Sequence, residues 1–196
     1  MDRNYQPLPT RELGENAGFR RPMQPQPPRV SAESPATDVM TDLTRTAPAT
    51  IRPQAPLAGA NQFMISRGVR LLLVIDDHET VLGVITATDI LSEKPMRVAT
   101  ERGLRRQDLS VADVMTPAAQ VEAIAFNELR GMHVGHVLET LRRAGRQHAL
   151  VVESEGGRSL VRGIFSLSQI ARQLGITLSG ETEVARTFSE IESAIK

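Results

Sequence analysis

Apolar residues in the first half of the chain show a helical spacing in one stretch and form short strand-like runs elsewhere. Residues 49–51 are a short strand candidate, and Gly68 ends the predicted helix, because glycine readily adopts the left-handed conformation found after a helix C-terminus. Two further strands are expected at 71–75 and 81–85, and a second helix begins at Thr86. The predicted order is β-α-β-β-α. The apolar face of the first helix comprises Leu57, Ala60, Phe63 and Met64.

The second half of the chain repeats this order. The segment 112–116 repeats 37–41, and the segment 163–170 repeats 83–90. A long helix ends at Gly145, as the first-copy helix ends at its own glycine. Its apolar positions are Val134, Val137, Leu138 and Leu141. The strands that follow are expected at 150–152 and 160–165.

We therefore predict an α+β protein built from two copies of one small domain, at residues 36–95 and 110–175, with a linker at 96–109. A copy of about 60 residues buries too small a fraction of its surface to be more than marginally stable. Pairing the copies solves this problem. It also creates a pseudo-two-fold axis and two equivalent clefts.

The two ends of the chain differ from this pattern. Residues 1–35 are rich in proline and poor in periodic apolar positions, which predicts a disordered arm, either a passive tail or a docking arm. Residues 180–196 predict an amphipathic helix. This helix could pack on its own module or join two subunits. Its apolar stripe is Val184, Phe188, Ile191 and Ile195.

Composition narrows the class of protein. The 196 residues contain 23 Lys+Arg and 23 Asp+Glu, so there is no excess of positive charge for nucleic acid or a membrane surface. There is no cysteine, which excludes disulfides and thiolate chemistry. The longest aliphatic run, 71–75, is far shorter than the roughly 20 residues of a membrane helix. We expect a soluble cytoplasmic protein.

Candidate chemistry lies at the start of the helix after the second strand. Thr86 at the N-cap and Asp89 at the third helical position fit a capping box, which is a structural role. The same place also suits a ligand, because a helix N-terminus favours a phosphate and the hydroxyls of Thr86 and Thr88 can donate. A carboxylate can accept hydrogen bonds from both hydroxyls of a ribose diol. Ser166, Ser168 and Gln169 occupy the corresponding positions in the second copy.

Three motifs recur in the same order in both copies: D-x-M-T, a short aliphatic run ending in an acidic residue, and G-h-h-T/S-x-x-D, where h is apolar and Gln169 replaces the final Asp in the second copy. This arrangement resembles the cystathionine β-synthase (CBS) domain, and two in tandem look like a CBS pair, or Bateman module, over about residues 36–175. The resemblance implies a regulatory module that is not an enzyme. It also implies a site for an adenosine-containing ligand such as AMP, ATP or S-adenosylmethionine, whose binding is passed on to a partner protein.

The resemblance assigns roles to residues. Asp89 would hold ribose at the junction that begins at Gly83, whereas Gln169 replaces the carboxylate in the second cleft and predicts a weakened or empty site. We therefore expect one nucleotide per chain. The adenine slot would be flanked by Arg70 and Leu71 in the first copy and by Gln147 and His148 in the second, with Pro48 and Ala49 as the opposite wall of the first cleft. Arg70 could instead reach a phosphate.

Other candidate sites are weaker. His133, His136 and Glu139 could approach a metal from one helix, but a polar helix face opposite the apolar positions explains them better. The basic run 101–106 fits a solvated linker better than an anion site. No residue set supplies a nucleophile, a base and an orienting group, so we expect no catalytic site, no metal and no required cofactor.

The sequence thus predicts a stand-alone regulatory CBS pair that binds an adenosine nucleotide and acts through an effector protein. The alternative is a scaffold whose clefts no longer bind. We expect a homodimer, because the helices carry more apolar positions than one narrow stripe needs. The residues expected at its interface are Leu57, Met64, Ile65, Val134, Leu138 and Leu141.

Overall fold

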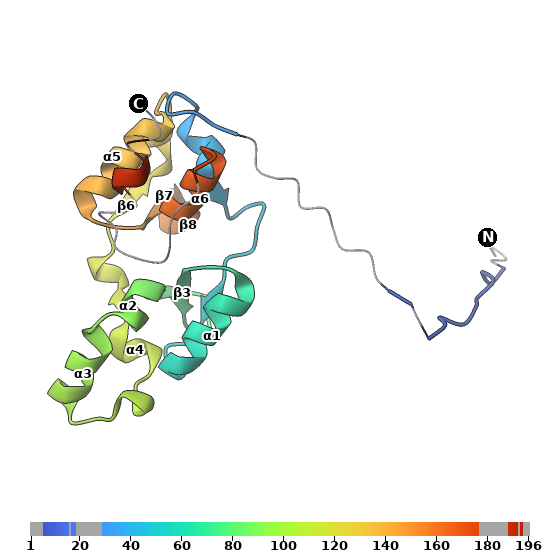
Figure 1. Ribbon diagram of the computed structural model, residues 1–196, viewed down its shortest axis with the longest axis horizontal. Helices are drawn as coiled ribbons and strands as arrows, with labels where there is room; N and C mark the ends of the chain where they lie inside the picture. The colour runs from blue at the N-terminus through green and yellow to red at the C-terminus, as the bar shows by residue number, and fades with distance from the viewer. Residues whose placement is uncertain (1–5, 16, 19–28, 177–187, 192, 194–196) are drawn as a thin grey trace.

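The computed structural model describes residues 6–15, 17–18, 29–176, 188–191 and 193 (Figure 1). The folded part forms two lobes, each with a four-stranded sheet covered by helices. The predicted α+β class is confirmed. We call the lobe around the sheet β2-β3-β4-β5 the first lobe and the lobe around β1-β8-β7-β6 the second lobe.

The strands follow the predicted pattern with small shifts at their ends. In the first lobe β2 runs parallel to β3, and β4 is antiparallel to both β3 and β5. In the second lobe β6 runs parallel to β7, and β8 is antiparallel to both β7 and β1. The bounds are β1 Met40–Asp42, β2 Thr50–Ile51, β3 Leu71–Ile75, β4 Val81–Thr86, β5 Thr116–Pro117, β6 Ala123–Ala125, β7 His148–Glu155 and β8 Arg158–Ser166.

Six α-helices and four short 3-10 helices complete the elements named here. The predicted glycine ends are present, since Gly68 and Gly145 follow α1 and α5 with φ of 64° and 60°. The α-helices are α1 Leu57–Arg67, α2 Ala87–Leu91, α3 Lys94–Arg102, α4 Val111–Val114, α5 Val134–Ala144 and α6 Leu167–Gln173. The 3-10 helices are η1 Ala36–Val39, η2 Arg106–Asp108, η3 Ala118–Gln120 and η4 Phe126–Leu129.

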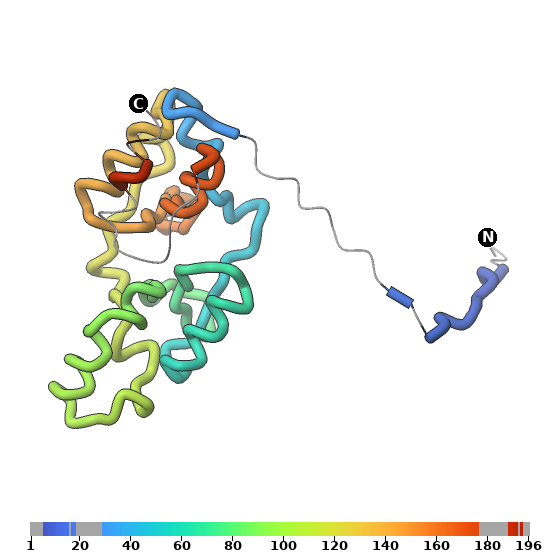
Figure 2. Tube along the Cα trace, viewed as in Figure 1, coloured from blue at the N-terminus to red at the C-terminus, as the bar shows by residue number. Residues whose placement is uncertain are grey.

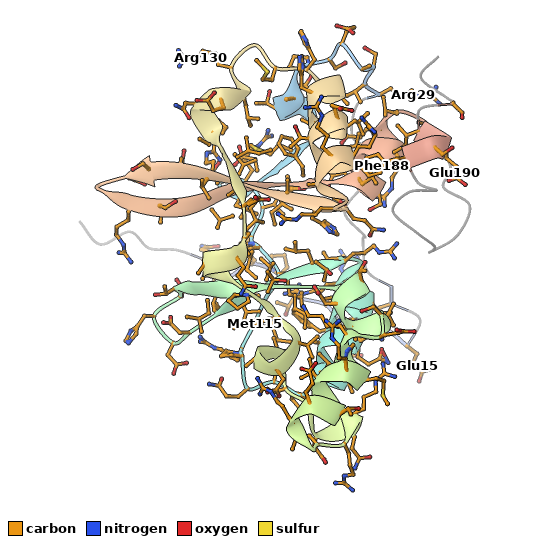
Figure 3. All side chains as sticks on the ribbon, turned by 90° about the vertical axis from the view of Figure 1, so that its left-hand side faces the viewer. Glu15, Arg29, Met115, Arg130, Phe188 and Glu190 are labelled. Carbon is orange, nitrogen blue, oxygen red and sulfur yellow. The ribbon has the colours of Figure 1, made fainter. Side chains whose placement is uncertain are left out.

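The leading segment of each sequence copy belongs to the lobe of the other copy. Strand β1, from the first copy, pairs with β8, whereas β5, from the second copy, pairs with β4. Figure 2 shows the blue N-terminal segment among the orange and red segments, and Figure 3 shows Met115 in the first lobe. The two halves are therefore interlocked rather than placed side by side.

Two glycines allow this exchange. A Cβ on Gly83 of β4 would collide with the carbonyl oxygen of Thr116, and a Cβ on Gly163 of β8 would collide with the side chain of Met40. These glycines occupy equivalent positions in the two copies. Each provides the close approach that the exchanged segment needs.

Three apolar clusters stabilise the two lobes and hold them together. One fills the first lobe and includes Val111 and Val114 of the exchanged helix α4, and another fills the second lobe and includes Ala36 and Val39 of the exchanged helix η1. The third lies between the sheets. Its buried members are Leu71, Leu73, Val84 and Leu150. This contact provides the pairing that the small size of each copy predicts.

The predicted arm and linker both contain folded residues. Val30 donates to the carbonyl of Gln173, and Val134 donates to the carbonyl of Ser34, so residues 29–35 lie against the second lobe. The expected linker 96–109 includes most of α3, which buries Ala99 in the first lobe. Neither segment has the apolar periodicity of a long helix or strand, which is why the pattern assigned them no structure.

The C-terminal stripe packs on its own chain. Phe188 and Ile191 are buried in the core of the second lobe, and Figure 3 shows Phe188 there. Val184 and Ile195 lie outside the described residues. Of the two alternatives for this helix, packing on its own module and joining two subunits, the structure shows the first for Phe188 and Ile191.

The residues expected at a dimer interface are mostly covered within the chain. Of the six, Leu57, Met64, Val134, Leu138 and Leu141 are buried, and Ile65 is 66% exposed. The premise that a second subunit must cover these helices is therefore wrong, because the sheets, the exchanged segments and the C-terminal residues cover them instead.

Candidate functional site

A cavity of about 270 Å³ opens between the two lobes. It takes residues from both sequence copies, with an apolar floor from the cluster between the sheets and polar groups around it. The lining residues are Leu71, Val84, Thr86, Thr88, Asp89, Thr116, Gln120, Val121, Glu122, Gly145, Arg146, Gln147, His148 and Leu150.

The polar edge contributed by the first copy is the predicted capping box. Asp89 Oδ2 accepts from Thr86 N at 3.0 Å and from Thr86 Oγ1 at 2.7 Å, and the Asp89 N–H donates to Thr86 Oγ1 at 3.2 Å. The N–H of Ala87 donates to the carbonyl of Arg70. The start of α2 is thus held by its own chain, and the carboxylate has a fixed orientation at the cavity.

The other oxygen of Asp89 is held by a lysine. Lys94 Nζ lies 2.8 Å from Asp89 Oδ1, and the two side chains are 29% and 17% exposed. Lys94 is the first residue of α3, which begins directly after the break that ends α2. Sequence reasoning missed this ion pair, although Pro95 in the first turn of α3 is a signal that one helix ends and another begins here.

The opposite wall comes from the second copy. Val121 and Glu122 precede β6, while Gln147 and His148 lie at the start of β7. Arg146 Nη1 lies 3.2 Å from Glu122 Oε2, so an ion pair joins the two wall segments. Sequence reasoning missed Val121 and Glu122, although they stand before β6 as Pro48 and Ala49 stand before β2.

His148 is a neutral group in this wall at physiological pH. Burial, together with the smaller effect of the positive charge of Arg70, lowers the pKa of His148 from 6.5 to about 4. The imidazole can therefore both donate and accept a hydrogen bond, and its ring offers a flat apolar surface.

The structure groups the predicted site residues differently from the sequence. Leu71, Thr86, Thr88 and Asp89 line the cavity together with His148, which had been assigned to the second cleft. The lining does not include Pro48, Ala49, Arg70 or Gly83. The lobes face each other, so this cavity takes its hydroxyl and carboxylate edge from the first copy and its strand-entry wall from the second. By the correspondence of the two copies, we expect Pro48, Ala49 and Arg70 to face Ser166, Ser168 and Gln169 across the other cleft.

Gln169 does not form the predicted capping pair. Its Oε1 accepts from Thr41 Oγ1 at 2.9 Å, and Gln173 continues the contact by donating to the carbonyl of Asp38 at 3.0 Å. The hydroxyl of Ser166 is 3.1 Å from that of Ser168 instead. The longer amide side chain reaches the exchanged strand β1 and fastens it to α6.

The weaker candidates have structural roles. His136 Nδ1 accepts from the His133 backbone N–H at 3.0 Å and thereby caps α5, and no cluster of three or more metal-ligating side chains occurs among the described residues. The basic run is paired within the chain, with Arg102 bound to Asp113 and Arg105 to Asp108. In the described part of the chain, no helix is long and apolar enough to cross a membrane.

Comparison with known proteins identifies the fold. Residues 36–95 match the family model of the CBS domain. Among curated proteins, none matches the chain. An uncharacterized conserved protein from Pyrococcus horikoshii is similar in structure, with a TM-score of 0.54 and 24% identity over 78% of this chain and 100% of the other.

Two further solved structures are CBS pairs with bound ligands. CBSX2 from Arabidopsis thaliana, in complex with AMP, has a TM-score of 0.50 and 20% identity over 71% of this chain and 94% of the other. The CBS domain pair of protein MJ0100, in complex with 5′-methylthioadenosine and S-adenosyl-L-methionine, has a TM-score of 0.50 and 20% identity over 72% of this chain and 96% of the other. The fold of this chain is that of a tandem CBS pair, as the sequence motifs predicted.

Proposed function

We propose that the cavity between the lobes binds one adenosine-containing ligand per chain and that the protein is a regulatory sensor, not an enzyme. The observation that carries the proposal is the position of Asp89, whose carboxylate is held at the cavity edge by the capping box and faces a wall from the other copy. A fixed carboxylate beside an apolar slot suits a sugar diol joined to a flat base.

The cavity offers a matching place for each part of such a ligand. Leu71, Val121 and Leu150 supply an apolar slot for the base, and His148 can stack on it or bond its edge. Thr88 adds a hydroxyl near the ribose position. The AMP complex of CBSX2 and the nucleoside complex of MJ0100 support the choice of adenosine, since both proteins share this fold.

The position of the cavity suggests how binding is transmitted. A ligand that contacts Asp89 on one side and Val121 on the other would fix the two lobes relative to each other. A conformational change follows only if the ligand prefers one arrangement of the lobes. We infer that an effector protein recognises this arrangement. We also propose a cytoplasmic location and a homodimer, whose interface lies outside the five helix residues that are buried within the chain.

The alternative is a scaffold whose cavity stays empty. The Lys94–Asp89 ion pair favours it, because the lysine already occupies one carboxylate oxygen. The two functions differ in a simple measurement, since a ligand that binds only the folded state raises the melting temperature.

Asp113 provides a matched control for Asp89. It accepts from Ser110 N at 2.8 Å and from Ser110 Oγ at 2.7 Å, pairs with Arg102, and is absent from the cavity lining. Asp89→Ala and Asp113→Ala should each cost about 1–2 kcal/mol of stability through the lost cap. Only Asp89→Ala should abolish the thermal shift with adenosine, AMP and ATP. Equal shifts in both variants would refute the assignment, and the absence of any shift in the wild type would favour the scaffold.

A further inference from the structure

We infer that the cavity selects an adenosine-type nucleoside whose 5′ group carries no phosphate, over the nucleoside polyphosphates. This inference rests on the proposed function, because it takes the adenosine-binding role of the cavity as given. It concerns which members of that ligand class the cavity accepts. Three independent properties of the cavity lead to it: its charges, its helix terminus and its size.

The charged groups at the cavity are paired with one another. The lining contains two carboxylates, Asp89 and Glu122, and one permanent cation, Arg146. Arg146 is already bound to Glu122, and Lys94 is already bound to Asp89. A phosphate that took Arg146 or Lys94 as its cationic partner would also lie beside the carboxylate already paired with it, which would repel the phosphate. Burying a phosphate without such a partner is costly.

The helix terminus that the sequence offered to a phosphate is also occupied. The N–H of Ala87 is bound to the carbonyl of Arg70, and the N–H of Asp89 is bound to Thr86 Oγ1. The Asp89 carboxylate itself lies at this end of α2 and would repel an anion. A nest of free amides, which phosphate sites require, is therefore not formed by these two groups.

The cavity is small and half enclosed by apolar side chains. Its volume of about 270 Å³ lies just below the usual range of small-molecule sites, roughly 300–1,000 Å³. Leu71, Val84, Val121 and Leu150 take up much of the wall. The enclosed space suits a base and a sugar, so a chain of phosphates would extend from it towards solvent, with Arg146 as the one permanent cation of the described lining.

Arg70 is the cation that could oppose this inference. Its positive charge lowers the pKa of His148, yet Arg70 is not among the residues that line the cavity. If Arg70 reached a phosphate, affinity would rise with phosphate number and Arg70→Gln would remove the gain.

Isothermal titration of the wild-type chain with adenosine, AMP and ATP, at one fixed ionic strength and without magnesium, tests the inference. We expect adenosine to bind at least as well as AMP and about tenfold more tightly than ATP, which corresponds to about 1.4 kcal/mol. An affinity that rises from adenosine to ATP overturns the inference and leaves the proposed function standing. Failure of all three to bind overturns both.

Glu122→Gln tests the charge argument directly. Freeing Arg146 should raise the ratio of ATP affinity to adenosine affinity at least threefold over that of the wild type. Glu139→Gln is the control, because Glu139 forms exposed ion pairs with Arg142 and Arg143 on α5 and does not line the cavity. It should leave the ratio of ATP to adenosine affinity unchanged. The same ratio in Glu122→Gln as in the wild type would overturn the inference.

Discussion

The ammonium of Lys94 lies 2.8 Å from the carboxylate of Asp89, at the edge of a cavity that the two lobes share. Asp89 Oδ2 already accepts two bonds from Thr86. Lys94 therefore takes one of the few acceptor positions left for a sugar diol. The lysine acts as an internal competitor for the ribose hydroxyls.

Lys94→Met should strengthen adenosine binding by about three- to tenfold, because charge-assisted hydrogen bonds contribute about 1.5–3 kcal/mol and part of this is now spent on the lysine. The folded state should lose no more than about 1 kcal/mol. Calorimetry measures the first effect and urea unfolding the second. Arg97→Met, on the same helix but paired with Glu101, should change neither binding constant nor stoichiometry. Weaker binding in Lys94→Met would mean that the lysine contacts the ligand.

Gly83→Ala should destabilise the fold by about 1–3 kcal/mol, because the added methyl group meets the carbonyl oxygen of Thr116 and overpacks the β4–β5 contact. Gly59 is the control, since it lies inside α1 with open space around it. Gly59→Ala should stabilise the protein by about 0.5–1 kcal/mol through helix propensity. Urea unfolding measures both changes, provided that the m-value, the slope of the free energy of unfolding against urea concentration, stays the same in the variants. If Gly83→Ala left the free energy of unfolding unchanged, β5 would be able to move away from β4 at little cost.

Gln169→Asp should not create a second ligand site. The shorter side chain loses the reach to Thr41, and neither residue 169 nor Ser166 and Ser168 beside it line the described cavity. We expect a stoichiometry of one per chain in both wild type and variant, with about 1 kcal/mol lost from stability. Two sites per chain by titration in either protein would contradict this expectation.

Ile191→Ala should cost about 2–4 kcal/mol, since the side chain is fully buried in the core of the second lobe. The molar mass in light scattering should stay the same as in the wild type. Leu138→Asp should likewise unfold the second lobe rather than split a dimer, because Leu138 is buried within its own chain. A change of mass in folded Ile191→Ala would restore the subunit-joining role of the C-terminal helix.

His148 should make the protein less stable in mild acid. Its pKa is lowered from 6.5 to about 4 in the folded state, so the unfolded state binds more protons between these values. Above pH 6.5 the ring is neutral in both states. The free-energy cost of this histidine to the folded state grows as the pH falls from 6.5 towards 4. It amounts to less than about 3 kcal/mol, because the ring keeps some contact with water. His148→Leu, which copies the residue at the equivalent position Leu71, should flatten the stability profile between pH 6.5 and 4.5. If the stability of His148→Leu fell with pH as steeply as that of the wild type, another group would be responsible for the acid sensitivity.

The elements of the fold could be predicted because each depends on local spacing. The apolar face of α1 and the left-handed Gly68 are local signals, and the capping box of Thr86 and Asp89 is another. The exchange of β1 and β5 between the lobes is not local. The sequence signal for it is a pair of strand glycines, Gly83 and Gly163. A glycine indicates that another segment passes close by, but it does not identify that segment.

The cavity was predicted only on its first-copy side for a related reason. Thr86, Thr88 and Asp89 share one helix start, so their proximity follows from sequence distance alone. Val121 and Glu122 reach the same cavity only because the lobes face each other, and this arrangement depends on the apolar cluster between the sheets. Aligning Pro48 and Ala49 with the second copy would have identified Val121 and Glu122 as wall residues. It would not have shown which of the two clefts they line.

The exchanged segments also determine how the chain can be divided. A cut near Gly103 would separate the two sequence repeats but would leave each fragment with the edge strand of the other, so neither sheet would be complete in its own fragment. The fragments could fold only by associating, and unfolding of the intact chain should be a single cooperative transition rather than two. The pair is therefore the smallest part of this chain in which both sheets are complete. A single repeat, taken alone or moved into another protein, would lack the edge strand that the other repeat supplies.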